Sequence, residues 1–282
     1  MSFLHEIVER KRGELADAKR KLDLDELKRK IRDAPPVRPL AAALREKVGL
    51  IAELKRRSPS GGDMRRENFE QGPQAYAKSR AVKAVSVLTN ATDFGMSIEE
   101  LMRVRNIVSK PVLRKDFIFE EYQVYEARAF GADALLLMVN VLERDAMQRL
   151  FELSRELGLD VLFEAHTKEE IEAIPPGAQL YGINSRKFDD TEGWKQAKRL
   201  ILDGRARSDA MADPSVELGT FSLIRHLPKD SVKIAESGVE PSKLPDLVKM
   251  GYDAFLVGTS ILKAPAGAES ILQEFEKALD SC

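Results

Sequence analysis

The sequence predicts one α/β domain, a (β/α)8 barrel of the TIM type with a helical extension at its amino end. Eight short apolar runs alternate with longer amphipathic runs, the pattern of parallel strands joined by helical crossovers. A length of 282 residues suits one such barrel, which needs about 250. Within the single domain 1–282 we expect the extension over 1–40, the barrel strands over about 49–262, and a C-terminal helix over 263–282.

The amino-terminal residues predict one or two amphipathic helices. Residues 2–33 carry apolar side chains at helical spacing within a highly charged segment. Basic residues are balanced there by acidic ones, so a solvated helix face is the simplest interpretation. The proline-rich segment 34–40 (APPVRPL) should end these helices, because proline removes a backbone donor and disfavours the helical conformation before it.

The strands and crossovers follow in order. The expected strands are 49–54, 84–89, 111–116, 134–139, 161–165, 180–184, 232–237 and 254–259, with helices between them, for example over 97–108, 120–130 and 145–157. An internal repeat supports the eightfold array: Gly131 and Gly251, four units apart, each follow a helix and precede an aspartate and a strand. Each glycine is expected to end its helix in the left-handed conformation.

The composition excludes several classes of protein. The chain has 45 Lys and Arg against 46 Asp and Glu, which gives no electrostatic basis for binding nucleic acid or an anionic membrane. No apolar run approaches the roughly 18 residues of a membrane span, and the first residues lack the apolar segment of a signal peptide. The single cysteine, Cys282, fits a reducing compartment. We therefore expect a cytoplasmic protein. The composition does not determine the oligomeric state, for which our expectation is a monomer.

Charged residues occur where the predicted strands end, the position of active sites in this fold. In the first strand Ile51, Glu53 and Lys55 share a face, so both charges should point into the barrel mouth. The third, fifth, sixth and seventh strands end at Lys115, Glu164, Asn184 and Glu236. A structural ion pair would explain any one of them, but burying several charges without a task costs too much free energy. The cluster therefore predicts a pocket with acid and base groups.

Small residues end the seventh and eighth strands and predict a phosphate site. Glycine lets backbone N–H groups approach an anion, and the loops after these two strands usually bind phosphate in this fold. The expected phosphate-binding residues are Ser237, Gly238, Gly258 and Thr259. The chain has no Walker or GxGxxG motif and no zinc pattern, so we expect no nucleotide P-loop and no metal site. His166, two residues after Glu164, is interpreted as a partly buried structural histidine.

The motifs together resemble a known family. IAELKRRSPSGG, SVLTNATDFGMS, PVLRKDFIFEEYQVYEARAFGADALLLMV, LFEAH, YGINSR, IAESGV and FLVGTSIL follow one another in the chain. In this order they resemble the motifs of the indole-3-glycerol-phosphate synthases, and the helical extension also fits. The resemblance implies a cofactor-free decarboxylase of tryptophan biosynthesis. Its substrate would be 1-(2-carboxyphenylamino)-1-deoxyribulose 5-phosphate, converted into indole-3-glycerol phosphate by ring closure, decarboxylation and dehydration.

The resemblance also implies roles for single residues. Lys115 would be the general acid at the ribulose carbonyl oxygen, with Glu164 orienting it or moving protons. Glu53 would be the base or proton relay of the dehydration step. Asn184, also implied to be catalytic, would lie near the anthranilate together with Ser58 and Arg186. Lys55 would lie between the substrate carboxylate and phosphate. The remaining implied substrate contacts are Phe94 and Phe117 as aromatic walls, and Glu236 and Ser237.

The chain departs from the family between strands 6 and 7. The stretch 187–230 is longer than usual there, so the loop after strand 6 and any role of Trp194 stay open. Ala165 stands where valine is more common. Two further hypotheses also stay open. A Schiff-base lyase or aldolase would use Lys115 as a nucleophile, and a barrel without catalysis would only bind phosphorylated ligands.

Overall fold

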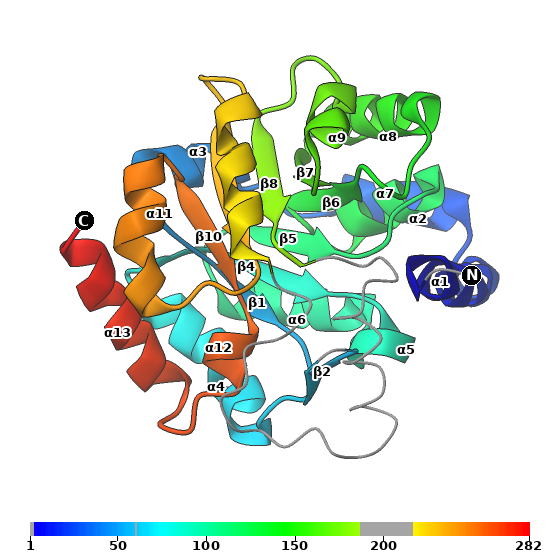
Figure 1. Cartoon of the computed structure of the whole chain (residues 1–282). Coiled ribbons are helices and arrows are strands. Elements are labelled where there is room, and N and C mark those ends of the chain that lie inside the picture. Colours follow the sequence, from blue (N-terminus) through cyan, green and yellow to red (C-terminus); the bar gives the residue numbers. More distant parts are fainter. Residues whose placement is uncertain (1–2, 60, 187–216) are drawn as a thin grey trace.

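The computed structural model describes residues 3–59, 61–186 and 217–282, and its centre is a closed parallel barrel (Figure 1). Each strand pairs with its neighbours along the chain, and the first pairs with the last, Gly49 opposite Ala254. The strands are β1 (Gly49–Leu54), β4 (Val82–Leu88), β5 (Val112–Lys115), β6 (Ala134–Met138), β7 (Asp160–Ala165), β8 (Leu180–Asn184), β9 (Val232–Glu236) and β10 (Ala254–Val257). The (β/α)8 barrel is confirmed, and every expected strand overlaps an observed one.

Helices surround the barrel and cover its outer face (Figure 1). They are α4 (Arg66–Lys78), α6 (Ile98–Ile107), α7 (Glu121–Ala129), α8 (Arg144–Glu156), α9 (Lys168–Ala173), α11 (Leu244–Met250) and α13 (Ala268–Asp280). Shorter elements are α5 (Ala91–Phe94), α12 (Thr259–Leu262), the 3-10 helices η1 (Leu218–His226) and η2 (Pro241–Lys243), and a hairpin of β2 (Arg57–Ser58) and β3 (Gly62–Asp63). The main apolar core lies between strands and helices. Residues 187–216, with Trp194, lie outside the described residues.

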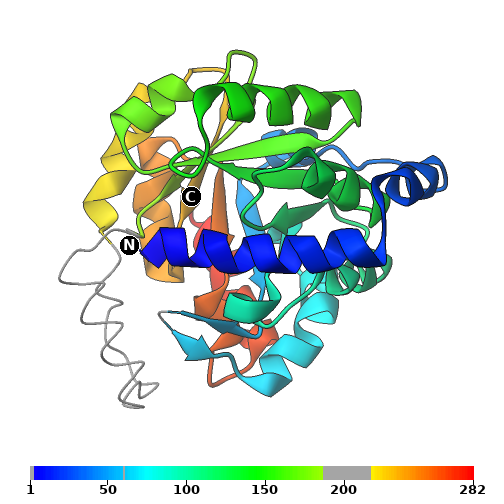
Figure 2. The same ribbon diagram turned by 90° about the vertical axis from the view of Figure 1, so that its right-hand side faces the viewer.

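The extension forms two helices, α1 (Phe3–Lys21) and α2 (Leu24–Arg32). Asp23 begins α2 with a capping box, in which its side chain accepts from Glu26 N and the Glu26 side chain accepts from Asp23 N. Figure 2 shows α1 running across one side of the barrel, and α13 lies on the opposite side. The expectation of a solvated face fails at Lys11, which is only 5% exposed.

A third helix, α3 (Leu40–Glu46), starts at the end of the proline-rich segment and was not expected. Its Leu40 and Leu44 belong to the apolar cluster inside the barrel, together with Ile51. Asp160, the first residue of β7, accepts a hydrogen bond from the α3 backbone at Ala41 N. Because this contact is at the first residue of β7, α3 closes the amino end of the barrel and leaves the carboxyl end open.

The internal repeat has a structural reason. Gly131 and Gly251 both adopt positive φ after a helix, at 83° and 101°, as expected. The aspartates that follow bind the backbone of the preceding strand: Asp133 accepts from Val112 N, and Asp253 accepts from Lys233 N, both at 2.8 Å. Each Gly-x-Asp unit therefore ends a helix and fixes the start of one strand against the previous one.

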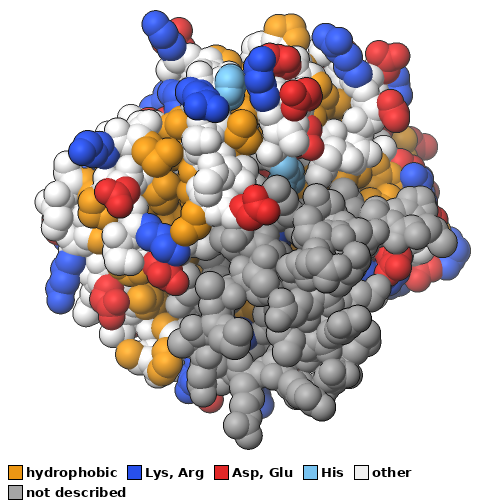
Figure 3. Space-filling model, viewed as in Figure 1, with side chains coloured by type: hydrophobic (Ala, Val, Ile, Leu, Met, Phe, Trp, Pro, Cys, Tyr) orange, Lys and Arg blue, Asp and Glu red, His pale blue; other side chains and the backbone are white. Residues whose placement is uncertain are grey.

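The described surface shows mixed charge. In Figure 3 the basic and acidic side chains are interspersed over the described part of that face. None of the helices in the described ranges is long and apolar enough to cross a membrane. The mixed charge of this face agrees with the nearly balanced composition of 45 Lys and Arg against 46 Asp and Glu.

Candidate active site

Strand alternation brings the charged residues to the carboxyl end of the barrel. Ile51 and Leu113 belong to the cluster inside the barrel, and the residues two positions further on, Glu53 and Lys115, share their face. The intervening Arg114 points the other way, where it is almost fully buried against Glu126 and Asp116. The face assignment made from the sequence for the first strand agrees with this arrangement of β1, and β5 shows the same alternation.

These side chains meet in a cavity of about 480 Å³. Every residue expected in the site lines it: Glu53, Lys55, Ser58, Phe94, Lys115, Phe117, Glu164, Asn184, Arg186, Glu236, Ser237, Gly238, Gly258 and Thr259. They come from all parts of the chain between β1 and α12, so only the closed barrel brings them together. The volume suits a small organic molecule.

Lys115 is the centre of the polar cluster. Its ammonium donates to Glu164 Oε2 and to Glu236 Oε2, both at 2.7 Å. Both carboxylates are 1% exposed, on β7 and β9. One ammonium is thus held between two buried carboxylates, an arrangement in which not all three groups can carry full charge without cost.

The two carboxylates respond in opposite directions. Burial raises the pKa of Glu236 to about 8, with the charge of Glu164 adding to this effect and Lys115 opposing it. Burial also acts to raise the pKa of Glu164, but Lys115, His166 and the hydrogen bonds lower it to about 2. For Lys115, burial disfavours the ammonium, yet the surrounding carboxylates outweigh burial and raise the pKa. At neutral pH the cluster therefore holds Glu164 ionised, Glu236 neutral and Lys115 charged.

Glu53, on β1, and Lys55, directly after β1, form a second ion pair. Lys55 Nζ lies 2.6 Å from Glu53 Oε1, and both groups are buried. Burial and the charges of Arg186 and Lys115 lower the pKa of Lys55, while Glu53 opposes them. A Cβ at Gly258 would collide with the Glu53 carboxylate, so glycine is needed here for a reason separate from anion binding.

Asn184 and His166 both lie beside the Oε1 oxygen of Glu164. Asn184 Nδ2 donates to Glu164 Oε1 at 2.8 Å, and Asn184 Oδ1 accepts from Arg186 N at 2.9 Å. His166 Nε2 lies 3.7 Å from Glu164 Oε1, and its Nδ1 is 3.3 Å from Glu170 Oε2. Burial acts against the charged imidazole, but Glu170 and Glu164 outweigh it and raise the pKa of His166. His166 does not line the cavity, in agreement with the structural interpretation.

The loop after β9 has an unusual backbone. Ser237 and Gly238 both adopt positive φ, at 69° and 66°, a conformation that is uncommon for serine. Ser260 Oγ donates to Val239 O at 3.0 Å and so ties this loop to α12. Small residues after β9 and β10 thus form one wall of the cavity: Ser237, Gly238, Gly258, Thr259 and Ser260.

Comparison with known proteins identifies the family to which this chain is similar. The sequence profile of the family described as Indole-3-glycerol phosphate synthase matches residues 4–206. An indole-3-glycerol phosphate synthase of Bacteroides thetaiotaomicron is 34% identical over 98% of this chain and 98% of its own length. Indole-3-glycerol phosphate synthase 1 of Streptomyces coelicolor is 38% identical over 93% of this chain and 90% of its own.

The chain belongs to the indole-3-glycerol phosphate synthase family. Solved structures with lower identity share the fold alone. Thiamine phosphate pyrophosphorylase from Pyrococcus furiosus has a TM-score of 0.57 at 16% identity, covering 84% of this chain and 98% of that one. 3-Hexulose-6-phosphate synthase from Salmonella typhimurium has a TM-score of 0.56 at 13% identity, with coverages of 83% and 99%.

The aromatic wall of this family member depends on a short helix. Phe94 ends α5, and its carbonyl accepts from Arg56 N at 3.2 Å. Arg57 Nη2 donates to Thr92 O at 2.8 Å, so the loop after β1 and the loop after β4 are joined. Ser58 also has a local role, since its Oγ accepts from Gly61 N at 3.0 Å.

The sequence did not indicate several residues of the site, and three of them bear on the argument below. Lys243 and Leu218 line the cavity, and Lys11 reaches Asp116 beside Lys115. Lys243 follows the SG pair by five residues, a spacing that could have indicated it. Lys11 gave no signal, because it lies in a segment full of lysines and arginines. Within the described ranges, no group of three or more His, Cys, Asp or Glu side chains could hold a metal ion.

Proposed function

We propose that this protein is an indole-3-glycerol-phosphate synthase that acts on 1-(2-carboxyphenylamino)-1-deoxyribulose 5-phosphate. The observation that carries the proposal is the Lys115 ammonium between Glu164 and Glu236 in a cavity with a small-residue wall on one side and Phe94 on another. Family membership supplies the identity of the substrate.

The substrate has three parts for which the cavity has matching groups. Its phosphate fits the backbone of Ser237, Gly238, Gly258 and Thr259, where no bulky side chain intervenes. Its carboxylate fits the cations Lys55 and Arg186, and its aromatic ring fits the apolar walls of Phe94 and Phe117. The ribulose chain between these parts would then lie beside Lys115.

Lys115 acts in the ring-closing step. The ring carbon that bears the carboxylate forms a bond to the ketone carbon, and the ketone oxygen takes a proton from the Lys115 ammonium. Carbon dioxide then leaves, and its bonding electrons restore the aromatic ring. A fixed ammonium in a pocket with little water stabilises the developing oxyanion more than solvent does.

Carboxylates act in the dehydration step. The hydroxyl formed at the former ketone carbon leaves as water, and the neighbouring carbon loses a proton, which completes the indole. Glu53, paired with Lys55, is the base or proton relay of this step in our proposal, and ionised Glu164 keeps Lys115 oriented and accepts or returns its proton. Asn184 fixes the second oxygen of Glu164.

The state of Lys115 argues against the Schiff-base alternative. A nucleophilic lysine must be neutral, but the two carboxylates raise the pKa of Lys115 and favour the ammonium. The charge that makes Lys115 a poor nucleophile is the one that a proton donor needs. The retained pairs Glu53–Lys55 and Glu164–Lys115 likewise argue against a barrel without catalysis.

Fluorescence detection of indole formation from the anthranilate-ribulose substrate tests the proposal. The wild-type protein should form product without added cofactor, and Lys115→Ala should lose about 10²- to 10⁴-fold in kcat, the range for general acid catalysis. Absence of product from the wild type would overturn the function. Normal turnover by Lys115→Ala would overturn the role of the lysine.

The same proposal takes the protein as a cytoplasmic monomer. The large apolar side chains that are exposed in the described part of the chain come from separate segments: Leu24, Met102, Leu218 and Met250. Scattered single residues do not form the contiguous patch that an obligate interface needs. Sedimentation at micromolar concentration should give one species of 31.6 kDa, and a dimer would contradict this part.

A further inference from the structure

We propose that Lys243 is a further phosphate-binding residue of this site and adds positive charge to the backbone cradle. The identity of its natural ligand, a phosphate monoester, rests on the proposed function. The sequence motifs did not include this lysine. It stands in η2, which directly follows the loop after β9.

The position of Lys243 is fixed by the loop that it serves. Lys243 Nζ donates to Gly238 O at 3.0 Å, and Lys243 N donates to Glu240 O at 3.0 Å. The side chain thus folds back over the turn formed by Ser237 and Gly238, whose positive φ values give that turn its shape. Lys243, Ser237 and Gly238 all line the cavity, so the ammonium lies on the same wall as the backbone N–H groups.

The ammonium keeps capacity for a ligand. Its carboxylate neighbour, Glu240, is 3.6 Å away with a side chain 58% exposed, and such an exposed pair contributes little. The Lys243 side chain is 35% exposed, so a ligand can reach it from the cavity. An ammonium has three donors, of which the Gly238 carbonyl takes one.

Two other cations of the cavity already have carboxylate partners. Lys55 is paired with Glu53, and Lys115 is shared by Glu164 and Glu236. A phosphate monoester carries close to two negative charges at neutral pH, and backbone donors alone compensate only part of them. Lys243 would therefore attract the dianion to this wall, while Glu240 beside it would repel the dianion and compete for the ammonium.

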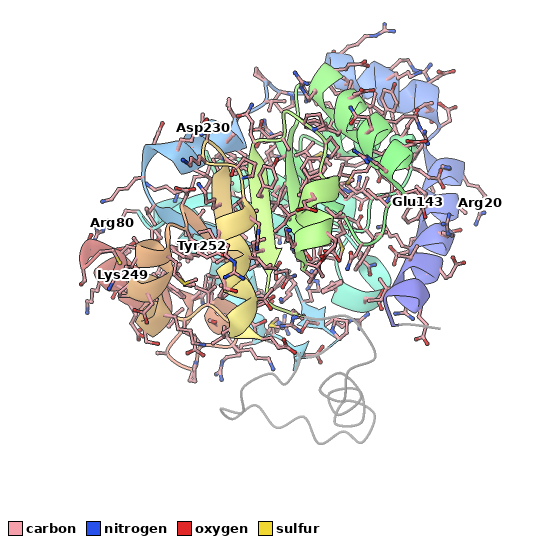
Figure 4. The ribbon with its side chains drawn as sticks, turned by 45° about the horizontal axis from the view of Figure 1, so that its top comes forward. Arg20, Arg80, Glu143, Asp230, Lys249 and Tyr252 are labelled. Atoms are coloured by element: carbon pink, nitrogen blue, oxygen red, sulfur yellow. The ribbon has the colours of Figure 1, made fainter. Side chains whose placement is uncertain are left out.

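This pair of opposite charges gives a test with opposite outcomes. Lys243→Met should weaken binding of inorganic phosphate about tenfold, because one charged hydrogen bond is lost. The KM for the substrate should rise similarly. The kcat should stay nearly unchanged, because the bound substrate and the transition state lose the same hydrogen bond. Glu240→Gln should tighten phosphate binding about two- to threefold. Lys249→Met is the matched control, because Lys249 is exposed on α11 outside the cavity and lies at the periphery in Figure 4.

Calorimetric titration with inorganic phosphate and steady-state kinetics give the two readouts, and thermal unfolding checks that each variant is folded. Phosphate binding by Lys243→Met that equals the wild type, or that equals Lys249→Met, overturns the proposal. So does a Glu240→Gln variant that binds phosphate more weakly. Phosphate binding needs no turnover, so a wild type that binds phosphate through Lys243 but forms no indole would refute the proposed function alone.

Discussion

Lys11 on α1 places its ammonium 2.6 Å from the carboxylate of Asp116, the residue that follows Lys115. The same ammonium donates to Thr89 O at 2.9 Å, and Thr89 N donates to the carbonyl of Lys115 at 3.2 Å. Arg10, one residue before, pairs with Asp93 of α5 at 2.6 Å. The extension thus binds two of the loops that shape the cavity.

Replacement of Lys11 by methionine should lower both stability and turnover. Asp116 is 2% exposed and would keep Arg114 and Thr89 as partners. We therefore expect a loss of about 2–3 kcal/mol, less than the loss for a buried charge that is left without any partner. The kcat should fall because Asp116 lies between Lys115 and Phe117. Denaturant unfolding and the indole assay measure the two effects.

Lys19→Met on the same helix is the control for this experiment. Lys19 pairs with Glu120 at the surface, where both side chains are about two-fifths exposed, so its loss should cost under about 1 kcal/mol. If both variants lose equal stability and neither changes kcat, α1 is only a cover for the barrel.

The alkaline limb of the activity profile should depend on Glu236. Below its raised pKa of about 8 Glu236 is neutral, and Lys115 is held by one ionised carboxylate. Above that pH Glu236 ionises, binds the ammonium more tightly and weakens it as an acid. We expect kcat/KM to fall as pH rises through about 8 in the wild type, and this limb to be missing in Glu236→Gln. Identical profiles would exclude Glu236 as its source.

Glu236 and Glu164 should make opposite contributions to stability across pH. The folded-state pKa of Glu236 is raised, so its contribution is complete below about 4.5 and is lost as pH rises towards about 8. The folded-state pKa of Glu164 is lowered, so its contribution is present above about 4.5 and is lost as pH falls towards about 2. Below about pH 4.5 the unfolding free energies of Glu236→Gln and the wild type should therefore be similar. Above that pH the wild type should lose stability, so the variant should become the more stable of the two.

Gly182 on β8 should be required by the carboxylate of Glu236. A Cβ at position 182 would collide with Glu236 Oε1 and approach Leu162. Gly182→Ala should displace Glu236 from Lys115, destabilise the fold by about 1–3 kcal/mol as in other overpacked cores, and reduce kcat. Gly219→Ala, with open space around its Cβ, should have little effect.

A double-mutant cycle measured by thermal unfolding isolates this contact. In a Glu236→Ala background the oxygen that obstructs the new methyl group is gone, so Gly182→Ala should cost much less. Equal costs in both backgrounds would mean that Gly182 serves the backbone or Leu162 instead of Glu236.

The local pattern of the sequence determined the barrel and the inward-facing charges. Each strand shows as a short apolar run, and the period of two places Glu53 with Ile51 and Lys115 with Leu113 on one face. The left-handed ends at Gly131 and Gly251 are equally local, because glycine adopts that conformation without a neighbour's help. These features depend on residues close together in the chain.

Only the tertiary structure decided which distant groups meet. Lys11 and Asp116 are 116 − 11 = 105 positions apart in the sequence, yet they form one buried ion pair. Gly182 faces Glu236 because β8 and β9 are paired with Gly182 opposite Ile234. The pKa difference between Glu164 and Glu236 arises because both carboxylates share Lys115. Periodicity assigns a side chain to a face, but barrel closure and strand register set its distance from the other charges, and that distance determines protonation and chemistry.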